Sequence, residues 1–166
     1  RPFEAAFALE HPPLSSIYDW STTAANNGTI DSGVAAQEGQ QPSTVNDGVR
    51  GVMAREAEFI KDIGGTLSAG GTANALTLTA NSAFTAYQTG ILLAFKATAT
   101  NTGAATLNVN GIGAKAIRKN GDDALEAGDI ESGGMFVVRY LATANGAAGA
   151  WMLESPAVSF SEKVPD

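Results

Sequence analysis

The 166-residue chain contains no cysteine. Disulfide bonds, thiolate nucleophiles and cysteine-ligated metal sites are therefore excluded. Histidine occurs only once, as His11 in a proline-rich stretch, and no Gly-x-Ser-x-Gly motif accompanies it. Because nucleophilic catalysis needs a base beside the nucleophile, we predict that the protein is not an enzyme and that it uses no cofactor or metal.

Charge is also scarce. Only 16% of residues are charged, against about 25% in ordinary soluble domains. The formal net charge is -7 and the pI is near 4.6, which argues against binding to nucleic acid or to an anionic membrane surface. No run of about 18 apolar residues occurs, so we expect no membrane insertion. The remaining polar residues are mostly Thr, Asn, Ser and Gln, as suits a surface that packs against copies of itself.

The first 41 residues lack the regular spacing of apolar residues that would form a hydrophobic core. Prolines exclude regular helix near the start, and the polar stretch from Ser21 to Gln41 contains turn signals such as Asn27-Gly28. We expect an extended arm, residues 1–41, that lies on another protein. The aromatic residues expected to make this docking contact are Phe3, Phe7, Tyr18 and Trp20.

One helix is predicted within residues 42–65. Pro42 and Ser43 open it, with Ser43 or Asn46 as the N-cap, and Gly64-Gly65 ends it. Its length of about 19 residues corresponds to roughly 28 Å.

The apolar positions of this helix recur at alternating spacings of four and three, which is typical of helices that pack in bundles. Gly48 and Gly51 each cost about 1 kcal/mol relative to alanine, so the helix is marginal alone and its stripe must be buried elsewhere. The positions of this stripe are Val45, Val49, Val52, Glu56, Phe59 and Ile63.

Residues 66–160 are predicted to be β-structure, with 161–166 as a tail. About six or seven short strands alternate apolar and polar residues, and Asn-Gly pairs separate several of them. We expect a small antiparallel sandwich or barrel. The predicted strands lie around Leu76–Leu78, Ile91–Phe95, Leu107–Val109, Ile117, Met135–Leu141 and Trp151–Leu153, and the turns at Asn110-Gly111, Asn120-Gly121 and Asn145-Gly146.

Two of these strands, Ile91–Phe95 and Met135–Leu141, are apolar on both faces. In a small antiparallel domain only one face is expected to be core. The second face is covered either by the same chain or by another subunit, and both possibilities stay open.

Three motifs could indicate a dinucleotide, calcium or catalytic site, but each is better explained as a loop or a turn. Gly111–Ala116 resembles a dinucleotide fingerprint, but a short strand follows it instead of the helix that would bind the phosphates, so we expect a loop. The oxygen-rich run from Asn120 to Glu126 fails the calcium-loop spacing at Ala124. Glu126, Asp129 and Glu131 are expected to form a solvated loop and not a catalytic carboxylate pair.

A resemblance emerges from the order of several motifs. Ile17-Tyr18-Asp19-Trp20-Ser21-Thr22-Thr23-Ala24 resembles the opening of many bacteriophage and prophage tail-fibre proteins. Glu38–Asp47, followed by Arg50, Asp62 and Gly64-Gly65, is similar to the fibre signature that precedes a helix. Gly71–Thr79 and Asn101–Gly111 resemble the β-module found after that helix.

The resemblance implies a homotrimeric structural subunit of a phage tail or collar fibre, located in the virion. Its partners would be its own copies and other tail, collar or baseplate proteins. The stripe of the helix within residues 42–65 would then be the trimer interface, with Arg55 of a neighbouring copy as the partner of Glu56. The alternative is a carbohydrate-binding module that recognises a host surface glycan. In that case an exposed aromatic residue such as Trp20 or Tyr87 would stack on the sugar, whereas Trp151, within an apolar strand, is expected in the core.

Overall fold

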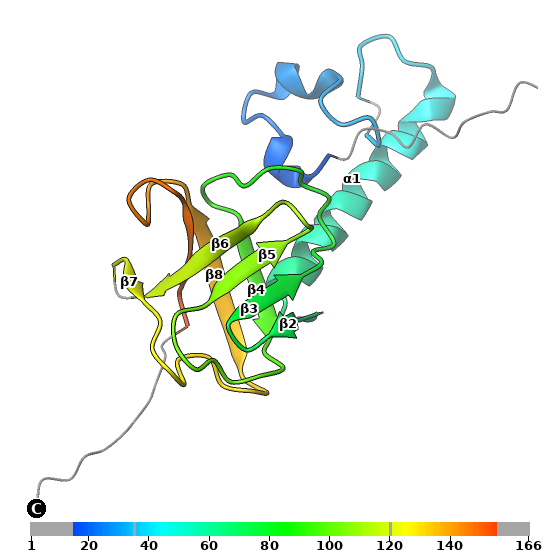
Figure 1. Cartoon of the computed structure of the whole chain (residues 1–166). Coiled ribbons are helices and arrows are strands. Elements are labelled where there is room, and N and C mark those ends of the chain that lie inside the picture. The colour runs from blue at the N-terminus through cyan, green and yellow to red at the C-terminus, as the bar shows by residue number, and fades with distance from the viewer. Residues whose placement is uncertain (1–14, 35, 120, 156–166) are drawn as a thin grey trace, which may run out of the picture.

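The computed structural model describes residues 15–34, 36–119 and 121–155. One long helix packs against a nearly closed β-barrel, and its N-terminal half extends beyond the barrel (Figure 1). The elements in chain order are the 3-10 helices η1 (Ile17–Asp19) and η2 (Ala24–Gly28), the α-helix α1 (Pro42–Ile63), and the strands β1 (Leu67–Ser68), β2 (Gly70–Thr72), β3 (Ala75–Leu78), β4 (Leu92–Lys96), β5 (Thr106–Val109), β6 (Ala114–Lys119), β7 (Asp123–Ala124), β8 (Met135–Leu141) and β9 (Ala150–Leu153).

The nine strands form one sheet in the order β1-β4-β8-β9-β6-β5-β3-β2, and β7 pairs with β6. The two ends of this order, β1 and β2, are separated in the chain only by Ala69. Residues 67–72 therefore bridge both ends of the sheet and bring it close to a full barrel, which leaves few unpaired strand edges. The barrel is filled by apolar side chains, and the largest of those with no more than 1% exposure are Ile91, Leu93, Phe95, Leu107, Val109, Ile117, Ile130, Val138 and Trp151.

The predicted strands are confirmed where apolar and polar residues alternate. Trp151 is fully buried, as expected. Asn110 and Gly111, between β5 and β6, both have positive φ values of 53° and 73°. Asn145 and Gly146, between β8 and β9, also have positive φ values, of 55° and 62°. Asn-Gly pairs adopt such turns readily, which explains these two antiparallel connections.

The expectation of an antiparallel module is wrong in part. The sheet is mixed, because β1–β4, β3–β5 and β6–β9 are parallel pairs. Each of these pairs joins strands that are not neighbours in the sequence, so no local turn signal could indicate its direction.

Helix α1 spans 22 residues, about 33 Å at 1.5 Å per residue. It begins at Pro42, whose fixed φ suits a first helical position, and Gln41 occupies the N-cap without a side-chain hydrogen bond. The predicted N-cap at Ser43 or Asn46 is therefore wrong. The C-terminus is as expected: the Gly64 amide donates to the Ile60 carbonyl at 2.8 Å, and Gly65 has a φ of 78°.

The C-terminal part of α1 packs on β4, outside the barrel. Ala94 points away from the core side chains Leu93 and Phe95, yet it is only 5% exposed. For this strand the second apolar face is therefore covered by the chain's own helix. On the neighbouring β8, Met135 remains 52% exposed. Among the described residues, no helix is both long and apolar enough to cross a membrane.

Candidate self-association surface

One face of α1 exposes large apolar side chains to solvent. Val45 is 44% exposed, Val49 55%, Met53 63% and Ile60 60%. These four residues, here named the apolar stripe, follow one another at spacings of four, four and seven, which places them along one side of a helix. Isolated apolar residues are common on surfaces, but a continuous line of four on a helix indicates a contact surface.

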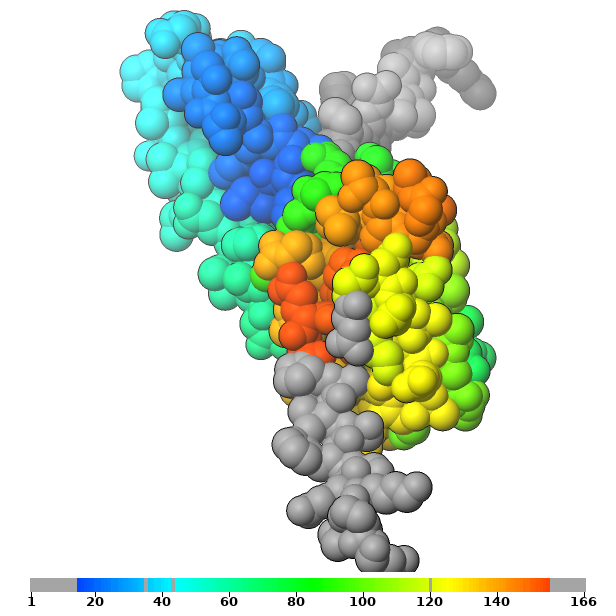
Figure 2. Space-filling model, turned by 90° about the vertical axis from the view of Figure 1, so that its left-hand side faces the viewer, coloured from blue at the N-terminus to red at the C-terminus, as the bar shows by residue number. Residues whose placement is uncertain are grey.

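The adjacent face of α1 is covered by residues 15–34, here named the strap. Figure 2 shows the strap in blue against the helix in cyan, beside the barrel. Val52 lines a small pocket of about 160 Å³ together with Trp20, Asp31 and Val34 from the strap. The expectation of an extended arm is therefore wrong for this part: two 3-10 turns fold the chain back onto its own helix.

Tyr18 joins the strap to both other parts of the molecule. Its ring makes edge contacts with Phe59 of α1, at 6.0 Å between centroids, and with Phe84, at 5.9 Å. Its hydroxyl lies 3.2 Å from both the amide and the carbonyl of Leu92 in β4. Burial raises the pKa of Tyr18, although the hydrogen bond with Leu92 opposes this shift. Helix, strap and barrel thus share one aromatic contact.

A buried ion pair holds the other end of the strap. Arg55 Nε donates to Asp31 Oδ2 at 2.8 Å, and the Asp31 side chain is 1% exposed. The same carboxylate accepts the Trp20 indole N–H at 3.2 Å and the Gly33 amide at 2.8 Å. Arg55 also pairs with Glu58 at 2.9 Å. These hydrogen bonds and the guanidinium charge stabilise the Asp31 carboxylate in its charged form.

The ion pair predicts an acid-sensitive strap. Burial alone would raise the pKa of Asp31, but hydrogen bonds from Arg55, Gly33 and Trp20 outweigh it and hold that pKa well below its usual range. A depressed pKa contributes stability that is present above the unfolded value of about 3.9 and is lost as the pH falls toward the folded value. The indole N–H resonance of Trp20 should therefore stay constant from neutral pH down to about pH 4 and shift only below it. A transition centred above about pH 5 would contradict this assignment.

Of the two glycines within α1, Gly51 is explained by a close contact with the strap. A Cβ added at Gly51 would lie 2.2 Å from the Gly33 carbonyl oxygen, so the strap backbone crosses the helix there in direct contact. Gly48 is also buried. Glycine within a helix costs about 1 kcal/mol, but only glycine permits this close approach at position 51.

Asp62, at the C-terminal end of α1, connects the helix to the loop that follows β3. It is fully buried, and its oxygens accept the amides of Asn81 at 2.6 Å and Ser82 at 2.9 Å and the Asn81 side-chain amide at 2.8 Å. The sequence offered only its place in the fibre signature, and no local pattern indicates a partner nineteen or twenty positions away.

Replacing Asp62 with alanine should destabilise the protein by about 1–3 kcal/mol, because it leaves the buried Ser82 amide without an acceptor and removes both hydrogen bonds from Asn81. Urea unfolding measures this loss. Asp47→Ala is the matched control, since Asp47 is 71% exposed and pairs only with Arg50 one turn away. Equal stability of the two variants would mean that the Asp62 contacts contribute nothing.

The predicted interface residues divide between the two faces of α1. Val45 and Val49 belong to the apolar stripe, whereas Val52 and Phe59 are half-buried beneath the strap, and Ile63 is half-buried near the barrel. Glu56 is exposed between Met53 and Ile60. Arg55 is not free to pair with Glu56 of another copy, because it is already engaged by Asp31 and Glu58, and that expectation is wrong.

The structure describes two of the four residues predicted to dock on another protein. Tyr18 and Trp20 are half-buried and make intramolecular contacts. Phe3 and Phe7, like His11, lie outside the described residues. The contacts of Tyr18 and Trp20 are missed by sequence reasoning because their partners are 11 to 74 positions away.

Of the three acidic residues expected in a solvated loop, Glu126 and Glu131 are exposed as predicted, but Asp129 is not. Asp129 is 6% exposed, pairs with Lys119 at 2.5 Å and accepts the Glu126 amide at 2.7 Å. It therefore stabilises the loop and is not part of a solvated turn. Within the described residues, no group of three His, Cys, Asp or Glu side chains is placed to hold a metal ion. Gly111–Ala116 forms a turn into strand β6, so the dinucleotide interpretation is excluded.

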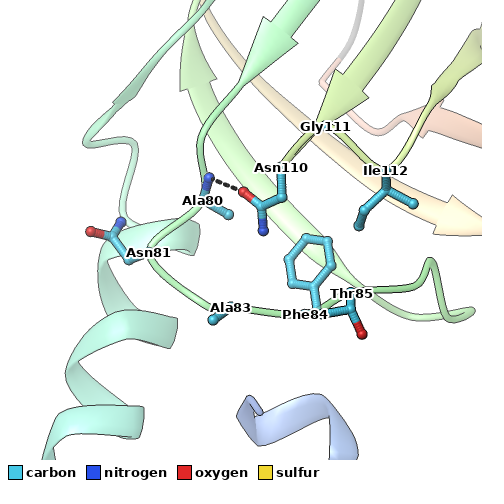
Figure 3. Close-up of a pocket in the computed structure, with 8 residues that line it drawn as sticks. All are labelled: Ala80, Asn81, Ala83, Phe84, Thr85, Asn110, Gly111 and Ile112. Carbon is cyan, nitrogen blue, oxygen red and sulfur yellow. Dashed lines mark hydrogen bonds between the residues drawn. The ribbon is translucent and has the colours of Figure 1, made fainter. Parts of the chain in front are cut away.

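A hollow of about 420 Å³ lies between the loop after β3 and the turn after β5 (Figure 3). Its walls are mainly apolar and include Phe84 and Ile112. The Asn110 side chain, the most central amide, already accepts the Ala80 amide at 2.9 Å and donates to the Ser82 carbonyl at 3.0 Å. The Asn110 side chain therefore stabilises the loop after β3.

The aromatic residues suggested for sugar binding are used within the chain. The Tyr87 ring packs against Tyr140 and Trp151, with centroids 5.0 and 5.3 Å apart. Its hydroxyl donates to the Gly113 carbonyl at 2.7 Å and accepts the Val109 amide at 2.9 Å. Comparison of the chain with family models and with curated proteins finds no match.

Proposed function

We propose that the protein is a non-enzymatic structural subunit that assembles into a homotrimer through α1, and that the assembly is a fibre of a phage tail or collar. The observation that carries the proposal is the apolar stripe on a helix that extends beyond its own barrel (Figure 1). An uncovered stripe of this kind is stabilised when it packs against the same surface of other copies.

The barrel suits a projecting module. It closes its own sheet almost completely and keeps its core within one chain, so several barrels can lie around a helical bundle without exchanging strands. The order of motifs that resembles tail-fibre proteins supplies the virion part of the proposal. The alternative, a glycan-binding module, has less support, because Trp20 and Tyr87 are both hydrogen-bonded within the chain.

The virion assignment is tested by labelling. Antibodies raised against the purified chain, conjugated to gold, should mark the tail or collar of phage particles induced from the source bacterium when these are viewed by electron microscopy. Particles in which the codon for Trp151 is replaced by a stop codon should lose the label. Label on the capsid, or on no particle at all, would contradict the virion assignment.

A further inference from the structure

We infer that the strap selects which face of α1 meets the other copies, so that three parallel helices pack through Val49, Met53 and Ile60 and not through Val52 and Phe59. The inference rests on the proposed self-association and specifies its surface. The partner is a second and a third copy of this chain.

The first argument is the competition for one helix face. Val52 and Phe59 would be the natural seam by spacing, but the strap already packs on both. Removing it would break the buried Asp31–Arg55 pair and the Tyr18 contacts. Breaking such a pair by leaving one charge buried alone is strongly unfavourable. Another copy therefore meets the face next to the strap.

The second argument is the spacing on the free face. From Val49 the positions Met53, Glu56, Ile60 and Ile63 follow at intervals of four, three, four and three, and Asn46 precedes Val49 by three. This is a complete heptad pattern. It shares every second position with the seam through Val52 and Phe59 and differs from it by one residue at the positions between. A helix with such a pattern is complementary to an identical helix, because each side chain fits between four residues of its neighbour.

The third argument is the width of the free face. Ala57 flanks the seam on one side, and Val45 flanks it on the other. Asp47 and Arg50 pair with each other at 2.9 Å on the outer side. An apolar face wider than a two-stranded seam is covered better by two neighbouring helices than by one, which favours three copies over two.

Two polar side chains fall on the inferred axis. Asn46 at the N-terminal end can hydrogen-bond with its copies, a device that sets the register of helical bundles. Glu56 brings three carboxylates together without a basic partner, since Arg55 is held by Asp31 and Glu58. The inferred seam is therefore weakest at Glu56, and Glu56→Gln should shift the midpoint of trimer dissociation to higher urea concentration.

The absence of native cysteine makes a direct test possible. Single-cysteine variants Met53→Cys, Ile60→Cys, Val52→Cys and Ala54→Cys are treated with a short bifunctional maleimide, and the mass of each untreated variant is measured in parallel. Met53→Cys and Ile60→Cys should give covalent dimers in most chains. Val52→Cys beneath the strap and Ala54→Cys on the far side of the helix should remain almost entirely uncrosslinked.

Each other outcome has a distinct meaning. Efficient crosslinking of Val52→Cys would overturn the inferred face. Crosslinking at Met53 but not at Ile60 would overturn the parallel arrangement, because only parallel helices bring both residues beside their own copies. A trimeric mass with no crosslinks at either position would place the interface elsewhere on the chain. A monomeric mass for all variants would refute the proposed self-association as well.

Discussion

Replacing Met53 with aspartate should convert the assembly into single chains while the fold of each chain stays intact. Met53 is 63% exposed in the single chain, so an aspartate there has room and meets water. In the assembly three carboxylates would converge one turn from those of Glu56 and without basic partners, and burying unpaired charge costs several kcal/mol. We therefore expect association to weaken by at least about a hundredfold, which corresponds to roughly 2.8 kcal/mol.

The mass measured by light scattering reports this change directly. Wild-type protein should have about three times the 16.9 kDa of one chain, and Met53→Asp should have that of one. Ala54→Asp is the matched control, because Ala54 is exposed on the same turn but on the far side of the helix. If Met53→Asp retained the wild-type mass, or if Ala54→Asp also dissociated, the stripe would not be the contact surface.

Replacing Arg55 with alanine should release the strap from α1. The change leaves Asp31 buried and without its charged partner, which typically costs about 3–5 kcal/mol. The loss should appear as local opening, since the barrel core does not include residues 15–34. Hydrogen exchange at the amides of Gly33 and Val34, both bonded to Asp31, should accelerate strongly, while exchange in β8 stays slow.

Two further variants separate the ion pair from other effects of the change. Arg50→Ala removes an exposed pair, which is worth at most about 1 kcal/mol, and should leave the strap closed. The double variant Asp31→Leu, Arg55→Met removes both charges and should restore part of the protection, because apolar side chains can replace a buried pair. Unchanged exchange in Arg55→Ala would show that the pair does not hold the strap.

The sequence predicted those features that depend on near neighbours. Alternating residues placed the main strands, and Asn110-Gly111 and Gly64-Gly65 placed a turn and a helix end. Each of these signals acts within a few residues, so no knowledge of the rest of the chain is needed.

Features that depend on distant partners could not be predicted in the same way. The parallel pairs, the partner of Asp62 and the folding of the strap onto α1 all join segments separated by many residues. One signal was present but was given another meaning: Gly51 suggested a weak helix, whereas it marks the point where the strap backbone touches α1. A glycine inside a helix therefore also indicates a close crossing.

The apolar stripe of the helix was predicted from its spacing, but its exact positions were not, because they also depend on contacts with distant residues. Spacing alone allows two seams that share Val49, Glu56 and Ile63 and differ by one residue at their other positions. The burial of Val52 and Phe59 by the strap distinguishes between them, and that burial is a tertiary contact.

Sedimentation equilibrium of the wild-type chain over a wide range of concentrations tests self-association most directly. If three identical copies associate through the exposed side of α1, a single species of about 51 kDa is expected, which is three times the mass of one chain. A species of 16.9 kDa that persists at every concentration would contradict the account.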